Sequence, residues 1–183
     1  MSQPSYSPLR SKLPRKPWIK HAVLQFWHCD SCERLLHEYL DEDCTAEQRE
    51  LAASPPACCG HPMQPLLPLQ SKDSADNPAL DYEIVGGLNN NAVKVHWNSA
   101  ARPPRWIALQ TYTGVYLKHI SPTKFPPAVF PLSDEDAYAY CDKDVCEQCL
   151  YCCKKGCIIY AYTGGSTINF INMDKISHYF MKK

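Results

Sequence analysis

The chain has 183 residues, of which 45% are apolar and 21% are charged, and its formal net charge at pH 7 is zero. This composition is typical of a soluble globular protein and excludes an intrinsically disordered chain. A neutral chain of this length has no overall charge with which to bind a polyanion, and it can hold one ordinary domain or two small ones.

The first 17 residues have the composition of a flexible arm. They are rich in proline, which disfavours both helix and sheet ladders, so we expect residues 1–17 to be a solvated, disordered segment. The arm is basic, because five cationic residues precede Asp30, the first acidic residue: Arg10, Lys12, Arg15, Lys16 and Lys20. Docking to a partner or to nucleic acid is the alternative role of the arm, and nothing else in the sequence predicts nucleic-acid binding.

The sequence predicts a cytoplasmic protein that does not enter a membrane. No apolar run reaches the ~18 residues of a membrane helix, and the first residues carry charge and proline where a signal peptide has an apolar core. Eleven cysteines in the cytosol indicate metal thiolates rather than disulfides. They fall into two groups, with none between Cys59 and Cys141, which predicts two separate metal sites.

The first group contains a pair of cysteines separated by two residues, Cys29 and Cys32, and the adjacent pair Cys58 and Cys59. Four sulfurs can surround a tetrahedral iron or zinc ion, and they exclude hard cations such as magnesium. Adjacent side chains cannot both reach one ion from a regular strand or helix, so the second pair needs an irregular turn, which Gly60 favours. A disulfide-stapled loop is the alternative, and the lack of a secretory signal disfavours it.

The residues around these ligands predict a strand and a short helix. Residues 18–28 are rich in aromatic and branched side chains and predict a strand that leads into Cys29. Residues 45–48 have the pattern of a capping box, and Pro55 with Pro56 would end the helix that it starts. Cys44 precedes the cap; it is a spare thiol, an alternative ligand or, as we prefer, a small, partly buried residue.

Beyond a polar linker at residues 69–81 the sequence predicts a sheet-rich domain at residues 82–142. Short runs of strand-forming residues alternate with glycine, proline and asparagine turns, which is typical of an antiparallel β-sandwich. Thr113 and Gly114 predict a hairpin turn. The predicted strands are residues 82–85, 92–97, 106–112, 115–120 and 128–132.

Two parts of the chain resemble one known family. The first cysteine group, with Gly60, Pro62 and Met63 after the second pair, resembles the desulforedoxin module, a small rubredoxin-like domain that holds one iron through four thiolates. The sandwich segment is similar to the immunoglobulin-like iron domain of desulfoferrodoxin and superoxide reductase, in the same domain order, so that the resemblance covers roughly residues 20–142. Its landmarks are residues 93–95, 106–109, 118–122, 127–130 and 139–142. The resemblance implies a mainly β fold with a metal module at residues 18–68.

In that family the second domain binds a mononuclear iron through four histidines and one cysteine, and an open position binds superoxide. Carried over to this sequence, the thiolate falls on Cys141, the histidine three residues later falls on Asp144, and the histidine before the strand at residues 106–112 falls on Arg102. The resemblance therefore implies that the fold is kept and that the superoxide site is lost.

Histidines elsewhere in the sandwich do not restore that iron site. No histidine lies between His61 and His96, and His96 matches a family ligand only when no gap is allowed. We expect His96 and His119 to be structural or surface residues.

Residues 143–183 form a cysteine-rich extension. Cys146, Cys149, Cys153 and Cys157 have spacings that suit a tetrahedral zinc or iron site, with Cys141 and Cys152 as alternates. The spacing from Cys146 to Cys152 also resembles the cysteine stretch of a [4Fe–4S] ferredoxin, and both kinds of site remain open. The tail predicts a hairpin around Gly164 and Gly165, followed by a terminal helix whose apolar face suits core packing or a dimer surface.

These patterns predict a desulfoferrodoxin-like redox protein that transfers electrons, through a tetrathiolate iron centre, to a redox partner protein. The first alternative is a non-redox binding protein in which zinc occupies the thiolate sites. The second alternative is an active superoxide reductase with remodelled ligands. Four thiolates accept both iron and zinc, so the sequence leaves the metal undecided.

Overall fold

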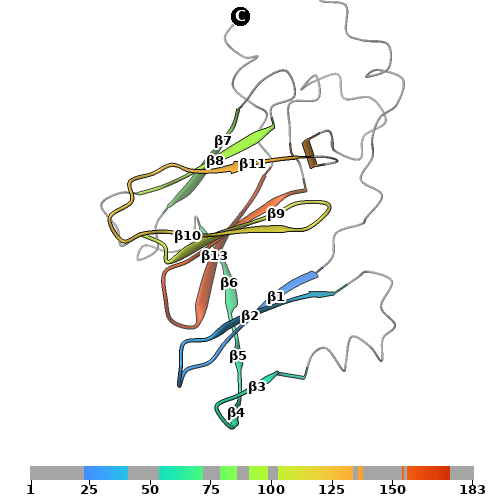
Figure 1. The fold of residues 1–183 in the computed structure, drawn as a ribbon, viewed down its shortest axis with the longest axis vertical. Helices are drawn as coiled ribbons and strands as arrows, with labels where there is room; N and C mark the ends of the chain where they lie inside the picture. Colours follow the sequence, from blue (N-terminus) through green and yellow to red (C-terminus); the bar gives the residue numbers. More distant parts are fainter. Residues whose placement is uncertain are drawn as a thin grey trace, which may run out of the picture.

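The computed structural model describes residues 23–40, 54–71, 79–85, 91–98, 103–133, 136–137, 154 and 156–173. Within these ranges the chain is almost entirely strand and turn, as the sequence predicts (Figure 1). The strands are β1 (Val23–His28), β2 (Leu35–Leu40), β3 (Ala57–Cys58), β4 (His61–Pro62), β5 (Gln64–Pro65), β6 (Leu67–Gln70), β7 (Leu80–Val85), β8 (Ala92–Trp97), β9 (Trp106–Gln110), β10 (Val115–His119), β11 (Ala128–Pro131), β12 (Ile158–Tyr162) and β13 (Thr167–Asn172).

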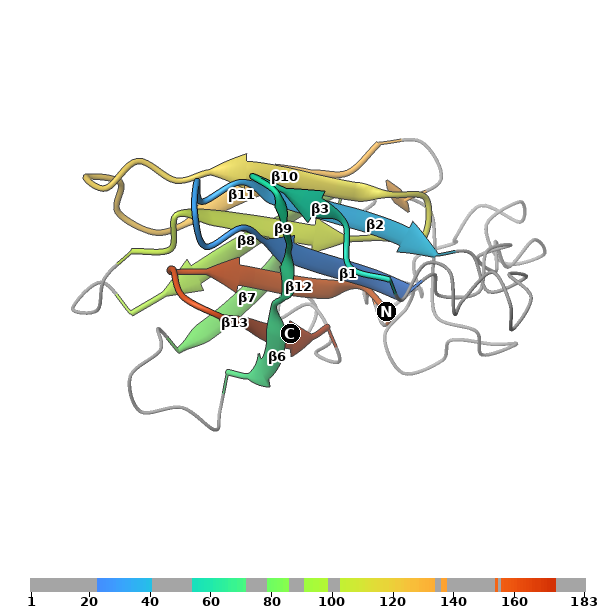
Figure 2. The ribbon, with the colours of Figure 1, turned by 90° about the horizontal axis from the view of Figure 1, so that it is seen from below.

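Three sheets form three layers. A central five-stranded sheet has the order β10-β9-β12-β13-β6, and it lies between the sheets β11-β8-β7 and β2-β1-β5 (Figure 1). Seen from below, β1 and β2 lie over the face of the central sheet (Figure 2). The strands β3 and β4 form a separate two-stranded ribbon. The first cysteine group therefore belongs to a layer that packs on the sandwich.

Both faces of the central sheet are covered by apolar side chains. The larger core lies between this sheet and β11-β8-β7 and includes Val93, Val95, Ile107 and Phe130. A second core lies on the opposite face and joins Phe26 of β1 to side chains of the central sheet. Because it is covered on both sides, β9 is buried at all its positions, whereas β7 alternates between buried and exposed residues.

The five strands predicted between residues 82 and 132 are confirmed, with ends that differ by two residues at most. The Thr113-Gly114 turn joins β9 to β10, and the Thr111 amide donates to the Gly114 carbonyl at 2.8 Å. The hairpin at Gly164 and Gly165 joins β12 to β13, and both glycines have positive φ, 125° and 82°. The predicted helix that begins at residue 45 and the predicted terminal helix at residues 173–183 lie outside the described residues, apart from Ser54 and Met173, which are not helical.

The boundaries of the sandwich differ from the sequence-based prediction. Residues 69 and 70, placed in a linker by the sequence, belong to β6, which pairs in parallel with β13. The hairpin β12–β13, expected in a separate extension, enters the central sheet because β12 pairs with β9 on one side and with β13 on the other. The sandwich thus continues to Asn172 and uses residues from both sides of its expected limits. No helix in the described parts of the chain is long and apolar enough to cross a membrane.

Candidate metal centre

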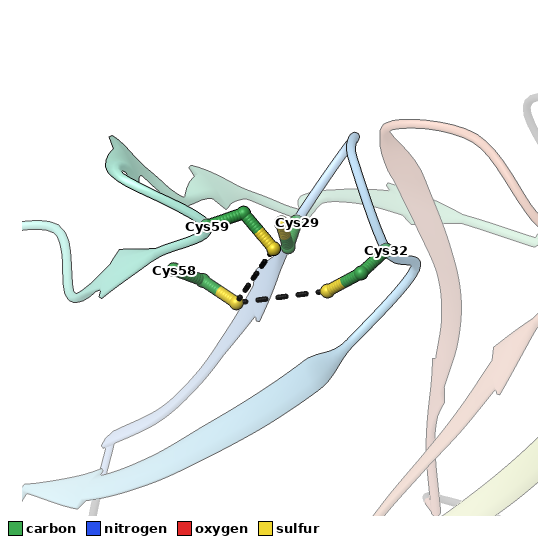
Figure 3. A group of neighbouring side chains, drawn as sticks. All are labelled: Cys29, Cys32, Cys58 and Cys59. Atoms are coloured by element: carbon green, nitrogen blue, oxygen red, sulfur yellow. Dashed lines mark hydrogen bonds between the residues drawn. The ribbon is translucent and has the colours of Figure 1, made fainter.

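Two turns bring the four cysteines of the predicted first site together (Figure 3). Cys29 directly follows the last residue of β1, and Cys32 lies in the turn that leads from β1 towards β2. Cys58 is the last residue of β3, and Cys59 begins the turn to β4. The predicted ligand set of the first site is therefore assembled by these two turns.

The four sulfurs have the spacing of a tetrathiolate site. All lie within 4.8 Å of one another, with Cys32 Sγ 3.6 Å from Cys58 Sγ and Cys58 Sγ 3.9 Å from Cys59 Sγ. Metal–sulfur bonds of about 2.3 Å in a tetrahedron place neighbouring sulfurs about 3.8 Å apart. The cysteines form no disulfide. The arrangement can hold one iron or zinc ion.

The first ligand turn, residues 29–33, is closed by two backbone hydrogen bonds. The Glu33 amide donates to the Cys29 carbonyl at 2.8 Å, and the Cys29 amide donates to the Arg34 carbonyl at 2.9 Å. Glu33 adopts a left-handed backbone with φ of 55°, a conformation that is uncommon for residues other than glycine, asparagine and aspartate. The turn directs the sulfurs of Cys29 and Cys32 to one point.

The second ligand turn, residues 58–60, allows two adjacent cysteines to face the same site. Cys59 and Gly60 both have left-handed backbones, with φ of 52° and 79°. This reverses the chain, so that both neighbouring sulfurs face the same site. The Met63 amide donates to the Pro56 carbonyl at 2.8 Å and closes the ribbon behind the turn. The irregular turn expected from the adjacent cysteines is confirmed.

The thiols differ in their readiness to ionise. Hydrogen bonds from the backbone of Cys32 and of Ser31 lower the pKa of Cys29 to about 7. Burial raises the pKa of Cys58, and hydrogen bonding with Cys32 and Cys58 raises the pKa of Cys59 to about 12. Four thiolates so close together repel one another without a cation. Binding of a divalent metal therefore has to displace protons from this site.

One side of the site is covered and the other is open. Cys29 and Cys58 are buried in a small cluster with Trp27 and Met63, and the Trp27 indole donates to Glu38 Oε2 at 2.9 Å. Cys32 and Cys59 are exposed. An ion bound here would be shielded by apolar side chains on one side and accessible through two sulfurs on the other.

The layer that carries the site is fixed to the central sheet by aromatic rings. The Phe26 ring lies 5.2 Å from the rings of Trp106 and Tyr160, measured between centroids. His28, directly before Cys29, lies 6.1 Å from the ring of Tyr162. Glu33 forms an ion pair with Arg105, which lowers the pKa of the carboxyl and raises that of the guanidinium. These contacts join both ends of the first ligand turn to the sandwich, and local sequence patterns do not indicate them because the partners are far apart along the chain.

The described residues of the sandwich do not assemble the histidine-rich iron site of the resembled family. Within the described ranges, the four cysteines are the one group of potential ligands close enough to share a metal ion. His96 lies on β8 beside Glu83 at 3.5 Å, while His119 is exposed on β10 in the other sheet. Cys141, Asp144 and Arg102 lie outside the described residues. The described histidines therefore give no basis for superoxide chemistry at a second iron.

The strand β12, whose Tyr162 pairs with Trp106 of β9, does not end in a cysteine such as the family's thiolate ligand. In β12 the residues Tyr160, Ala161 and Tyr162 are followed by Thr163. The sequence directly before Cys141 has the same tyrosine-alanine-tyrosine pattern, and the family resemblance places its landmark there. The repetition of this pattern is the signal that could have indicated a second possible alignment.

The second cysteine group is described only at its end. Cys157 is buried in the larger core, and its carbonyl accepts a hydrogen bond from the Met173 amide at 2.9 Å. The buried Lys154 ammonium donates to the carbonyls of Asp136 and Ala137 at 2.9 and 2.8 Å, which joins the residues on either side of 138–153. The other predicted ligands, Cys141, Cys146, Cys149, Cys152 and Cys153, lie outside the described residues.

Comparison with known proteins supports the fold assignment. No family model matches the sequence, and no curated protein sequence matches it. The structure is similar to the crystal structure of the superoxide reductase from Treponema pallidum, with a TM-score of 0.50 and 17% sequence identity over 83% of this chain and 99% of that chain. At this identity the likeness extends to the fold, and the activity of this chain has to be argued from its own residues.

Proposed function

We propose that this chain is a desulfoferrodoxin-like, iron-binding redox protein that transfers electrons through the centre formed by Cys29, Cys32, Cys58 and Cys59. The observation that carries the proposal is the convergence of these four sulfurs within 4.8 Å. Bound iron would supply a ferrous–ferric couple at this site. A ligand set made only of thiolates suits iron and zinc and selects against magnesium and calcium.

The surrounding residues support an electron-transfer role. Trp27 and Met63 exclude water from the side of Cys29 and Cys58, which limits the rearrangement of solvent when the charge of the centre changes. Cys32 and Cys59 are exposed, so a redox partner protein can approach the centre through these two sulfurs. A rigid, half-covered site of this kind suits outer-sphere electron transfer to a partner.

The first test is the colour and metal content of the protein. Protein produced with iron should be red, with thiolate-to-iron charge-transfer bands that bleach when dithionite is added. Replacement of Cys58 with serine should remove the metal, because one of the four ligands is lost. A colourless protein that contains zinc, even from iron-rich anaerobic culture, would favour the zinc-stabilised, non-redox alternative.

Superoxide reduction is not part of the proposed function. The described histidines assemble no second metal site, and the sequence has Arg102 and Asp144 where the family has histidines. Stopped-flow mixing of the reduced protein with superoxide should show no fast oxidation of a second iron. A rate near the diffusion limit of about 10⁸–10⁹ M⁻¹s⁻¹ would instead indicate an active reductase with remodelled ligands.

The cysteines at 141–157 are proposed to bind a second metal independently of the first site, as an iron–sulfur cluster or a zinc or iron ion. Their short spacings allow a site to close locally with little loss of chain entropy. Joint replacement of Cys146 and Cys149 by serine should lower the total metal content and leave the spectrum of the first site unchanged. An unchanged metal content would show that these cysteines are free thiols or disulfides.

A further inference from the structure

The first ligand turn contains a backbone conformation that its sequence does not favour. Among the described residues, two non-glycine residues have positive φ, and both lie in the ligand turns: Glu33 at 55° and Cys59 at 52°. Cys59 is a ligand, so its identity is set by the metal. Glu33 is not a ligand, and glycine would adopt the same backbone with less strain. The glutamate side chain therefore calls for a separate explanation.

The left-handed backbone at Glu33 is needed to close the turn. With this backbone the chain turns back after Glu33, and the Arg34 carbonyl accepts a hydrogen bond from the Cys29 amide at 2.9 Å. That hydrogen bond holds the residues between the two ligands in a single tight turn. If Glu33 relaxed to an extended backbone, the bond would break and the Cys29 and Cys32 sulfurs would no longer be held on one point.

The side chain of Glu33 is held by a residue of the sandwich. Arg105 Nη1 donates to Glu33 Oε2 at 2.5 Å, across 72 positions of sequence. The backbone of Arg105 is itself fixed, since its amide donates to the Tyr162 carbonyl at 2.7 Å and its carbonyl accepts from the Ile120 amide at 2.9 Å. The guanidinium therefore extends from a rigid point directly before β9.

We propose that Arg105 is a positioning residue for the metal centre. By binding the Glu33 carboxylate it holds Glu33 in the left-handed conformation that the first ligand turn requires, so the sandwich contributes to the metal affinity of the cysteines. The contact between His28 and Tyr162, 6.1 Å between ring centroids, holds the other end of the same turn. This inference depends on metal binding at the four cysteines, and it is independent of which metal binds and of any redox role.

The test is a double-substitution cycle with cobalt(II) as the probe, because tetrathiolate cobalt has strong absorption bands. Dissociation constants and rates of loss to a chelator are measured for the wild type, Arg105→Ala, Glu33→Gly and the double variant. Arg105→Ala should weaken cobalt binding by about two- to fivefold, the range expected for loss of an exposed ion pair. In the Glu33→Gly background the same replacement should have no measurable effect, because glycine adopts the left-handed backbone without the ion pair.

The matched control is Arg34→Ala, which removes the same charge beside the same turn. The Arg34 carbonyl takes part in the turn, but its guanidinium does not bind Glu33, so this variant should bind cobalt like the wild type. Near-UV circular dichroism checks that each variant is folded, and Arg105→Gln replaces Arg105→Ala in the cycle if the alanine variant is not folded.

Equal losses from Arg105→Ala in the glutamate and glycine backgrounds would overturn the proposal, because Arg105 would then act without Glu33. No loss in either background would overturn it as well. If the wild type binds no cobalt at all, both this inference and the proposed function fail. If the wild type has a normal tetrathiolate cobalt spectrum but the effects of Arg105→Ala and Glu33→Gly simply add, only this inference fails.

Discussion

Replacement of Phe26 by alanine should destabilise the whole protein, because this ring joins the cysteine-bearing layer, formed by β1 to β5, to the sandwich. Phe26 is 2% exposed, and its ring contacts Trp106 and Tyr160 at 5.2 Å. Burial of a phenylalanine side chain contributes about 1.5–3 kcal/mol, and each aromatic pair adds about 0.5–1.5 kcal/mol. Buried Phe→Ala changes in other proteins cost about 3–5 kcal/mol, so we expect a loss of about 3–4 kcal/mol here.

Guanidinium unfolding of the metal-loaded protein, followed by tryptophan fluorescence and circular dichroism, would measure this loss as a lower midpoint at unchanged slope. Leu36→Ala is the matched control, because Leu36 lies in the same hairpin and is 38% exposed; it should cost less than about 1 kcal/mol. A loss below about 1 kcal/mol for Phe26→Ala would refute the reasoning, since the cysteine-bearing layer would then be independent of the sandwich.

Three further predictions concern the metal site, a turn and the core. The affinity for zinc should rise with pH between about 6 and 9, because the metal displaces protons from the thiols of Cys58 and Cys59, whose pKa values are raised. Calorimetry would measure the release of these protons, and an affinity that does not change with pH would contradict the prediction. An added Cβ meets no atom within 4 Å at either Gly165 or Gly114, but only Gly165 has a left-handed backbone, with φ of 82°. Gly165→Ala should therefore lower the free energy of unfolding by about 1–2 kcal/mol, whereas Gly114→Ala should change it by less than about 0.5 kcal/mol in the same denaturation assay. Asp136→Ala should cost about 2–3 kcal/mol, because the buried carboxylate accepts hydrogen bonds from the hydroxyls of Thr111 and Thr113 at 2.8 and 2.6 Å; an unchanged thermal midpoint would show that these hydroxyls find other partners.

Local patterns predicted the features whose physical cause is also local. The strands at Ala92–Trp97 and Trp106–Gln110 follow from branched and aromatic residues between turn-forming ones. The four cysteines could be predicted as one ligand group because each pair lies within a single turn. The sequence did not show that the two turns come together in space. The adjacency of Cys58 and Cys59 even predicted the irregular backbone that the structure has.

Features that depend on distant partners could not be predicted in this way. Leu67–Gln70 contains a proline and has four exposed side chains, and it is a strand because its hydrogen bonds come from β13, a hundred residues later. Nothing near Glu33 indicates that Arg105 will bind it. The expected boundary between sandwich and extension also depended on pairing, since β12 inserts next to β9 only in three dimensions.

The cysteine-bearing layer makes two kinds of contact, within its own small cluster around Cys29 and Cys58 and through Phe26 with the central sheet. The two have different roles. Among the described residues of this layer, the buried cluster that it forms on its own consists of Trp27, Cys29, Cys58 and Met63, and a cluster of this size does not stabilise a fold without an ion or a neighbour. The second core provides that neighbour, because Phe26 packs on Trp106 and Tyr160 without involving any sulfur. Removal of the metal should therefore open the ligand turns while β1 remains packed on the central sheet. Under the proposed function the sandwich would serve as the scaffold for the site of four cysteines, which is consistent with a sandwich whose described residues assemble no metal site of their own.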